Sequence, residues 1–519
     1  MCPFAPIPLL FLSPIPSELQ AFLQEAYELL TGAPELLAQV EADLDAHGCR
    51  KKALRLADAA WHAQRTAPLP GLPSAPEPPP PTATALKLFQ GRPRTPALVV
   101  LLALLLRGFL GEGFKSSDAT MLTQESITLQ VLLGNLGLKM PGRSTLTELV
   151  NAISNQTRER LLDAQIARAL SLGLDDFTAL QQDSTHVEGN SAWPTESRLI
   201  VALVSRLLRA GASLGRLQVP AFEEPTVECH LVQLQKFDRE IDLSKGTQKG
   251  GPLREKRYRS LLRYARCSLR RLHLAVLGIE AALPRLAVAP SRKALAERAV
   301  TKLRADVDAL AQVITTCEAR ILHEQQVPMA DKKLSICDPD VGYIAKGQRV
   351  PVIGYKPQVA RSGAGFVVGF LLPKGNAADA TQLLPMVDEV TRRTGVVPEE
   401  VSLDDGYASA ANWAGLKARG CRVISINGSK GRALTPQADW DSDDYILARD
   451  RRSAIESLLF TLKQGFHFGT VARRGLTAVY GELLEKALAY NLCHFVRLRQ
   501  RAQARARRDG EPHRFAAAA

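Results

Sequence analysis

Three acidic residues of this sequence stand where they could carry out phosphoryl transfer. Asp183 follows FTALQQ and Asp404 follows EVSL, so each carboxylate lies at the end of a predicted strand, where α/β sheets place functional groups. Glu456 lies in the amphipathic stretch RDRRSAIESLLFTLKQGF. Carboxylates that converge repel one another unless cations neutralise them, and oxygen ligands suit Mg²⁺ or Mn²⁺. Two such ions could activate an attacking oxygen and stabilise a leaving oxygen at phosphorus.

Each acidic residue alone also has an ordinary interpretation. An aspartate at a strand end is often a turn former or a helix cap. The helical period places Glu456 on one side of its helix with Arg449, Arg452 and Lys463, which is typical of a solvated face with an intrahelical ion pair. Only the set of three carboxylates favours a metal site.

The elements around these residues predict an α/β fold. A strand that ends near Asp183 is followed, after a helical stretch, by the hairpin RVPVIGYKPQVA and GFVVGFLLP, with Gly363 and Gly365 in the turn. Then come a helix (AADATQLLPMVDEVTRRTG), a strand (EVSLDDGY), a helix (SAANWAGLKARG), a strand (CRVISIN), a polar loop and the helix of Glu456. This order indicates a mixed sheet with flanking helices, interrupted after the first strand by a helical insertion.

The aspartate segments resemble those of a known family, the DDE transposases of bacterial insertion sequences. DSTHVEGNSAWPTES, which begins at Asp183, is similar to the segment that carries the family's first aspartate. LDDGY is similar to the family's D-x-G-Y segment, and this selects Asp404 over Asp405. CDPDVGYIAKGQRVPVIGYKPQVA is similar to the family's hairpin region.

The helix of Glu456 extends the resemblance. RRSAIESLLFTLK resembles the family signature Y-x2-R-x3-E-x6-K, with Arg452, Glu456 and Lys463 in register. Arg449 stands where the signature has tyrosine, so a cation replaces that side chain.

The resemblance implies an RNase H-like catalytic domain over residues 173–198 and 335–497, in which the three carboxylates bind two Mg²⁺ or Mn²⁺ ions. Arg452 and Lys463 would hold phosphates near the cleaved strand, with Arg449 as a further cation. The implied enzyme is a Mg²⁺-dependent DNA transposase. It would bind the terminal inverted repeats of its element, cleave phosphodiesters and transfer 3′-OH ends to target DNA, as a homodimer in the synaptic complex.

Helical segments are expected before the first strand. Residues 1–65 form a helical N-terminal region, and the proline-rich stretch 66–95 forms a linker. Residues 96–172 carry several short helices. A Pro-Gly turn before Arg143 is compatible with a helix-turn-helix that binds the DNA ends, although ordinary helical bundles contain such turns too.

The predicted insertion, residues 199–334, has a strongly basic centre, KGTQKGGPLREKRYRSLLRYARCSLRRLH. This pattern favours contacts to DNA phosphates, and a solvated arginine-rich helix is the alternative. The basic tail 498–519 is predicted to be disordered. The predicted phosphate contacts of the insertion are Arg257, Arg263, Arg266, Arg270 and Arg271.

Composition limits the partners. With 519 residues the chain exceeds a single small domain. Its 66 Lys and Arg against 53 Asp and Glu give a net charge of +13, which favours an anionic partner such as double-stranded DNA.

The eight cysteines form no CxxC pair, as expected in a reducing cytosol. The apolar run 97–106 is too short for a bilayer and predicts a buried core helix. We therefore expect a cytoplasmic, nucleoid-associated protein without a membrane partner.

Two other functions fit the same residues. A hydrolytic RNase H-like nuclease would cut DNA without joining it, and a non-catalytic DNA-binding protein would use the basic helices alone. Inverted repeats beside the reading frame would favour the transposase.

Overall fold

The computed structural model describes most of the chain, in seven segments. The predicted linker 66–95, except for its last residue, and residues 510–519 of the predicted tail lie outside them. The described residues are 18–65, 95–110, 126–191, 195–217, 224–244, 250–345 and 350–509.

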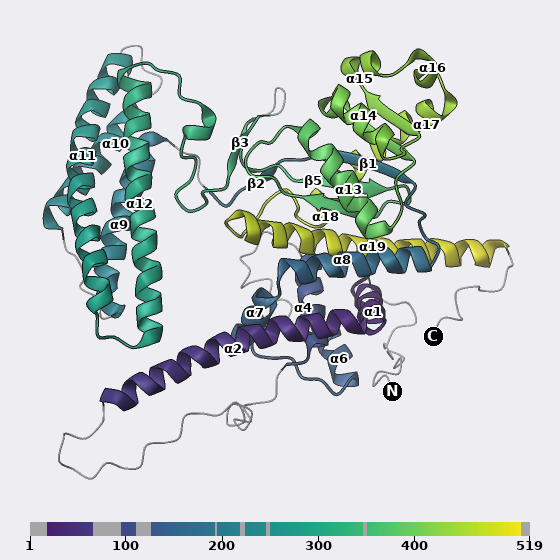
Figure 1. The fold of residues 1–519 in the computed structure, drawn as a ribbon, viewed down its shortest axis with the longest axis horizontal. Helices are drawn as coiled ribbons and strands as arrows, with labels where there is room; N and C mark the ends of the chain where they lie inside the picture. The colour runs from purple at the N-terminus through teal and green to yellow at the C-terminus, as the bar shows by residue number, and fades with distance from the viewer. Residues whose placement is uncertain are drawn as a thin grey trace, which may run out of the picture. The chain divides into compact units, whose positions relative to one another are not determined.

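The chain folds into two compact units. The described residues within 1–46, 93–190 and 340–519 form the first unit, and those within 47–92 and 191–339 form the second. Figure 1 shows the sheet and its helices in the first unit and a bundle of long helices in the second.

The centre of the first unit is a five-stranded mixed sheet with the order β6-β5-β1-β7-β8. β1 is antiparallel to β5 and parallel to β7, β5 is antiparallel to β6, and β7 is parallel to β8. The prediction of an α/β fold with a mixed sheet is therefore confirmed. The strands are β1 (Ala179–Ser184), β5 (Gln358–Ser362), β6 (Val367–Leu371), β7 (Glu400–Asp404) and β8 (Val423–Asn427).

Helices cover both faces of this sheet. The helices of the C-terminal half are α13 (Leu383–Thr394), α14 (Ala410–Ala418), α15 (Ser429–Leu434), α16 (Gln437–Trp440), α17 (Asp443–Arg451), α18 (Ser453–Gly465) and α19 (Leu476–Asp509).

Two consecutive residues of β6 show which helices lie on which face. A Cβ on Gly369 would lie only 2.4 Å from the sulfur of Met386 in α13, so the close approach of that helix requires glycine. The ring of Phe370 lies 5.2 Å, centroid to centroid, from that of Tyr480 in α19. Because successive residues of a strand point to opposite faces, α13 and α19 cover opposite sides of the sheet.

The predicted hairpin is correct only in part. β5 and β6 do pair, with Gly365 in the turn at φ +110°. However, β4 (Val352–Tyr355), which the prediction joined to β5, belongs to a separate three-stranded sheet with the order β2-β4-β3. The proline between the two strands, Pro357, has no N–H for a ladder and marks the break. The other two strands are β2 (Val187–Glu188) and β3 (Gly342–Ile344).

The segment after β8 also differs from the prediction. The expected polar loop contains α15, α16 and α17, and the expected single helix 449–466 is divided between α17 and α18 at Arg452. The two helices pack on different strands, because α17 contacts β7 and β8 whereas α18 contacts β1 and β5. The Ser402 hydroxyl fixes α17 by donating to the Ala448 carbonyl at 2.8 Å. Arg449 therefore lies on a different helix from Glu456.

The helices that precede β1 belong to the same unit as the sheet, except that residues 47–65 of α2 belong to the second unit. α4 is buried over nearly its whole length, as the apolar run predicted, and it packs on α19. No helix among the described residues is long and apolar enough to cross a membrane. The helices before β1 are α1 (Glu18–Thr31), α2 (Pro34–Arg65), α4 (Ala97–Leu110), α6 (Ile127–Asn135), α7 (Arg143–Ala152) and α8 (Asn155–Ser171).

The predicted tail is helical at its start. α19 continues to Asp509, so disorder does not describe residues 498–509. Arg499 holds this part of the helix against α1 through ion pairs with Glu25 at 2.7 Å and Glu28 at 2.8 Å. These partners lie more than 470 residues away, which a local charge pattern does not reveal.

The second unit is a helical bundle with its own apolar core. Leucine, valine and isoleucine side chains from all four helices fill that core, including Leu203, Leu234, Leu262 and Leu310. The unit includes the predicted insertion 199–334. Besides residues 47–65 of α2, its α-helices are α9 (Glu196–Ser213), α10 (Pro225–Leu243), α11 (Gly250–Ala282) and α12 (Pro290–Leu322).

Candidate active site

Two aspartates lie at equivalent positions on neighbouring parallel strands. In the β1–β7 ladder Gln181 pairs with Ser402, and Asp183 and Asp404 each lie two residues further along. Residues two apart share a face, and adjacent strands are about 4.8 Å apart. The sheet itself therefore places both carboxylates at one edge, as the strand-end interpretation predicted.

Asp183 faces the side of the sheet that α18 covers. The preceding residue, Gln182, points the other way and donates from its amide to the Gln382 carbonyl at 3.5 Å, just before α13. Asp183 is 6% exposed, and its Oδ1 accepts from the backbone N–H of Ser184 at 2.7 Å. One carboxylate oxygen is thus fixed by the chain next to it.

The two aspartates of LDDGY have different surroundings. Asp404 lines the cavity, with Oδ1 accepting from the Gly406 N–H at 3.0 Å. Asp405 turns to α15, where its Oδ1 accepts from the Gly431 N–H at 2.9 Å. Gly428 lies against this carboxylate with φ +131°, and a Cβ there would come within 2.6 Å of Asp405 Oδ1. Asp405 is therefore bound into the fold, whereas Asp404 faces the cavity.

Glu456 reaches the same place from α18, and Arg452 connects it to Asp183. Arg452 Nη1 donates to Glu456 Oε1 at 2.8 Å, and Nη2 lies 3.9 Å from Asp183 Oδ2. The Glu456 side chain is 59% exposed, whereas that of Arg452 is 20% exposed. The intrahelical ion pair of the ordinary interpretation exists, but its guanidinium also faces the sheet.

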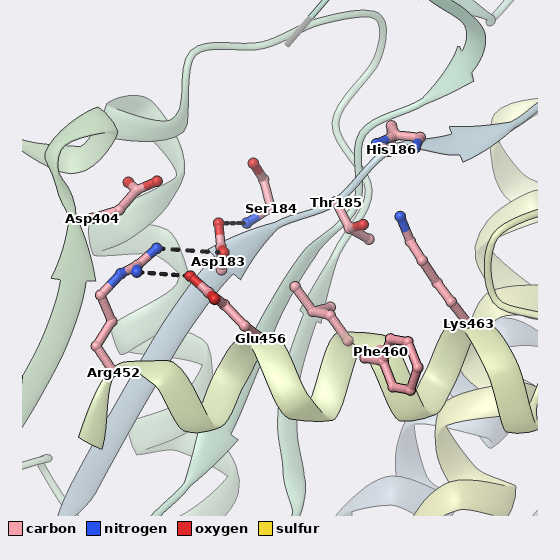
Figure 2. A pocket seen from close by; sticks show the side chains of 10 residues that line it. Asp183, Ser184, Thr185, His186, Asp404, Arg452, Glu456, Phe460 and Lys463 are labelled. Carbon is pink, nitrogen blue, oxygen red and sulfur yellow. Dashed lines mark hydrogen bonds and ion pairs between the residues drawn. The ribbon is translucent and has the colours of Figure 1, made fainter. Parts of the chain in front are cut away.

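These residues surround one cavity of about 520 Å³. Figure 2 shows carboxylates from β1, β7 and α18 on one side of it, and Lys463 and His186 on the other. In the described part of the chain, no three His, Cys, Asp or Glu side chains are arranged closely enough to hold a metal ion. The lining consists of Asp183, Ser184, Thr185, His186, Asp404, Arg452, Glu456, Leu459, Phe460 and Lys463.

Several lining residues were not predicted. Ser184 and Thr185 follow Asp183 directly, and no sequence signal distinguished them. Phe460 lies four residues after Glu456 and three before Lys463, so its helical spacing was the available signal.

A buried polar network lies beneath the strand ends. The hydroxyl of Tyr407 donates to Gln358 Oε1, and the Gln358 amide donates to Asp379 Oδ1 at 2.6 Å. Lys356 Nζ completes the network 2.9 Å from Asp379. Burial, and then the charges of neighbouring aspartates, raise the pKa of Tyr407 well above its usual value. The phenol therefore stays neutral and serves as a hydrogen-bond donor.

The remaining predicted residues lie outside this cavity. Arg449 belongs to α17, where its Nε is 3.5 Å from Asp450 Oδ1. Arg143 is exposed at the start of α7, which follows α6 after the predicted turn. Their contacts with DNA stay predictions.

The predicted basic residues of the insertion lie in the second unit, and most have partners within the bundle. Three of them form ion pairs with glutamates of the same unit, and a fourth packs on an aromatic ring. Arg257 pairs with Glu240 at 2.7 Å, Arg266 with Glu318 at 2.5 Å and Arg271 with Glu224 at 3.5 Å. The guanidinium of Arg263 lies 5.1 Å from the centroid of the Tyr264 ring, and Arg270 is exposed. Contacts of this surface with phosphate stay a prediction.

Comparison with known protein families gives a match in the C-terminal part of the chain. Residues 307–492 match the family model described as "Transposase DDE domain". The match extends from α12 into α19 and includes Asp404 and Glu456, whereas Asp183 precedes it. No curated protein and no solved structure matches the chain. Residues 307–492 are therefore similar to a transposase DDE domain, and Asp404 and Glu456 of the cavity lie within the matched region.

Proposed function

We propose that this protein is a transposase that cuts the ends of its own element and joins them to target DNA by two-metal chemistry in the cavity between β1, β7 and α18. One observation carries the proposal: Asp183, Asp404 and Glu456 come from three separate elements and line one cavity together with Arg452 and Lys463. The strand order and the helices on both faces are compatible with an RNase H-like domain.

The donor set fits divalent metal ions of the hard type. All three acidic groups offer carboxylate oxygens, as Mg²⁺ and Mn²⁺ prefer, and none of the described residues that line the cavity carries a thiol. Asp183 and Asp404 are brought together by the sheet, so their mutual repulsion favours a bound cation. When bound, the metal ions would supply an activated oxygen nucleophile and stabilise the leaving oxygen.

The cationic residues have a separate task in this proposal. Arg452 offers a planar set of donors that matches a phosphate, and its Nε is buried without a hydrogen-bond partner in the described structure. Lys463 offers a point charge on the far side of the cavity. A DNA strand that runs from one cation to the other would pass its phosphodiester beside the carboxylates.

The adjacent aspartates at the end of β7, Asp404 and Asp405, provide a matched test. Asp404→Asn should bind element-end DNA like the wild type and lose cleavage in Mg²⁺. Asp405→Asn should retain cleavage, because an amide oxygen can still accept the Gly431 N–H. Duplexes made from the DNA that flanks the reading frame, including any terminal inverted repeats there, serve as substrate, and gel analysis separates cut from joined products. Cleavage by Asp404→Asn would contradict the proposed site, and cutting without joining would favour the hydrolytic nuclease.

A further inference from the structure

An exposed aromatic ring lies in the wall of the cavity, among mostly polar side chains. Phe460 is 65% exposed and lines the cavity on α18, between Glu456 and Lys463 (Figure 2). The three residues are four and three positions apart, so they share one stripe of the helix. The ring therefore belongs to the functional edge of α18 rather than to its core face.

The packing of α18 does not require this ring. Ile455, Leu458, Leu459 and Leu462 already form a buried core face against the sheet. An exposed phenylalanine keeps a large apolar surface in contact with water, which is unfavourable until a partner covers it. The position therefore points to a ligand with a flat apolar face.

The surrounding charges indicate which ligand this is. Arg452 and Lys463 lie on either side of Phe460 along the chain, and the whole chain carries a net charge of +13. A ligand that offers anionic groups to the two cations and a flat apolar face to the ring between them has the chemistry of a nucleic-acid strand. In a duplex the base faces are already stacked, so the base that reaches the ring must be unpaired.

We propose that Phe460 is a stacking residue, which receives one unpaired base of the strand whose phosphates contact Arg452 and Lys463. This rests on the proposed function, because the same strand then presents its phosphodiester to the carboxylates. Stacking on an aromatic ring tolerates any base, so the contact would position the strand without reading its sequence.

Binding of single-stranded DNA tests this without catalysis. The probe is a fluorescent 12-nucleotide strand of mixed sequence, and affinity is measured by anisotropy in buffer without divalent metal. Phe460→Ala should weaken binding by about 5- to 150-fold, the range for loss of one stacked base, and Phe460→Trp should restore it. Leu447→Ala, which truncates a 53% exposed leucine of α17 outside the cavity, should bind like the wild type.

A strand of the same length without any bases tests whether the ring contacts a base. Wild type and Phe460→Ala should bind this abasic strand equally, whereas they should differ on the strand that carries its bases. Equal affinity of the two proteins for the unmodified strand would overturn the proposal, as would no binding by the wild type. So would the same difference between the two proteins on the abasic strand, since the ring would then contact sugar or a second copy of the chain.

The outcomes separate this inference from the proposed function. If the wild type cuts element ends in Mg²⁺ but Phe460→Ala binds single strands normally, only the stacking role is wrong. If the base-dependent loss is observed but no Mg²⁺-dependent cutting occurs, the stacking role stands and the proposed reaction is wrong.

Discussion

Glu485 and Glu456 of the first unit both form ion pairs with arginine, but they differ in burial and in the number of arginines that they contact. Glu485 of α19 is buried, with a side chain 3% exposed, and it contacts Arg107 of α4 at 2.7 Å, Arg158 of α8 at 2.8 Å and Arg473 at 3.3 Å. Glu456 of α18 is 59% exposed and contacts only Arg452 among the described residues.

The difference separates a carboxylate that holds the fold together from one to which the proposed function assigns a catalytic role. Burial alone would raise the pKa of Glu485, but the charges of Arg107, Arg473 and Arg158 outweigh it and hold that pKa far below its usual range. The oxygens of Glu485 are thus committed to holding three segments together. Glu456 faces a cavity with two further carboxylates, and an exposed i,i+4 pair contributes only about 0.3–0.5 kcal/mol. Little stability is lost when its oxygens change partner.

The largest expected effect is on catalysis at Glu456. Glu456→Gln keeps the shape of the side chain but removes a charge from the carboxylate set, so cleavage should fall on the order of 10³-fold or more, about 4 kcal/mol. The midpoint of urea unfolding should stay nearly unchanged, because the lost ion pair is exposed. Cleavage of element-end duplexes in Mg²⁺ and urea titration provide the two measurements. Substantial residual cleavage would remove Glu456 from the site.

The same substitution at Glu485 should have the opposite pattern. Glu485→Gln leaves three arginines without their buried counter-charge and should destabilise the first unit by about 3–5 kcal/mol. Urea titration measures the loss, and cleavage per folded molecule at low temperature should change far less than in Glu456→Gln. A neutral effect on stability would show that the cluster is not the structural centre of this unit.

The stabilisation by Glu485 should depend on pH, which provides a further test of its role. Because the folded pKa of Glu485 is depressed, its stabilisation is fully present above the unfolded pKa of about 4.3 and is lost as pH falls toward the folded value. The stability difference between the wild type and Glu485→Gln should therefore be constant near neutral pH and shrink below about pH 4. A difference that persists unchanged at pH 3 would contradict the ionised state of this carboxyl.

The sequence predicted the parts of this site that depend on local pattern. Alternation and strand ends located Asp183 and Asp404, and helical spacing joined Arg452, Glu456 and Lys463. It did not predict the break at Arg452, because the residue has helical dihedral angles, φ −54° and ψ −36°, and only packing on different strands separates the two helices.

Contacts between distant segments account for the other differences. Three arginines of α11 pair with glutamates that come mainly from neighbouring helices. The run of basic residues in the sequence did not reveal these partners, so it overestimated how many arginines are available to bind phosphate. Likewise, Glu485 meets Arg107 from 378 residues away. Such partners are determined by the tertiary fold and leave no local signature.

The smallest expected effect concerns the network beneath the strand ends. Tyr407 donates a buried hydrogen bond to Gln358, so Tyr407→Phe should cost about 0.5–1.5 kcal/mol of unfolding free energy. If the network positions Asp404, three residues earlier, the variant should also need about 10- to 100-fold more Mg²⁺ for half-maximal cleavage, the range for lost outer-shell partners of metal ligands. Saturating Mg²⁺ should restore most of the rate. A lower rate that Mg²⁺ does not restore would limit Tyr407 to a structural role and leave the comparison of the two glutamates intact.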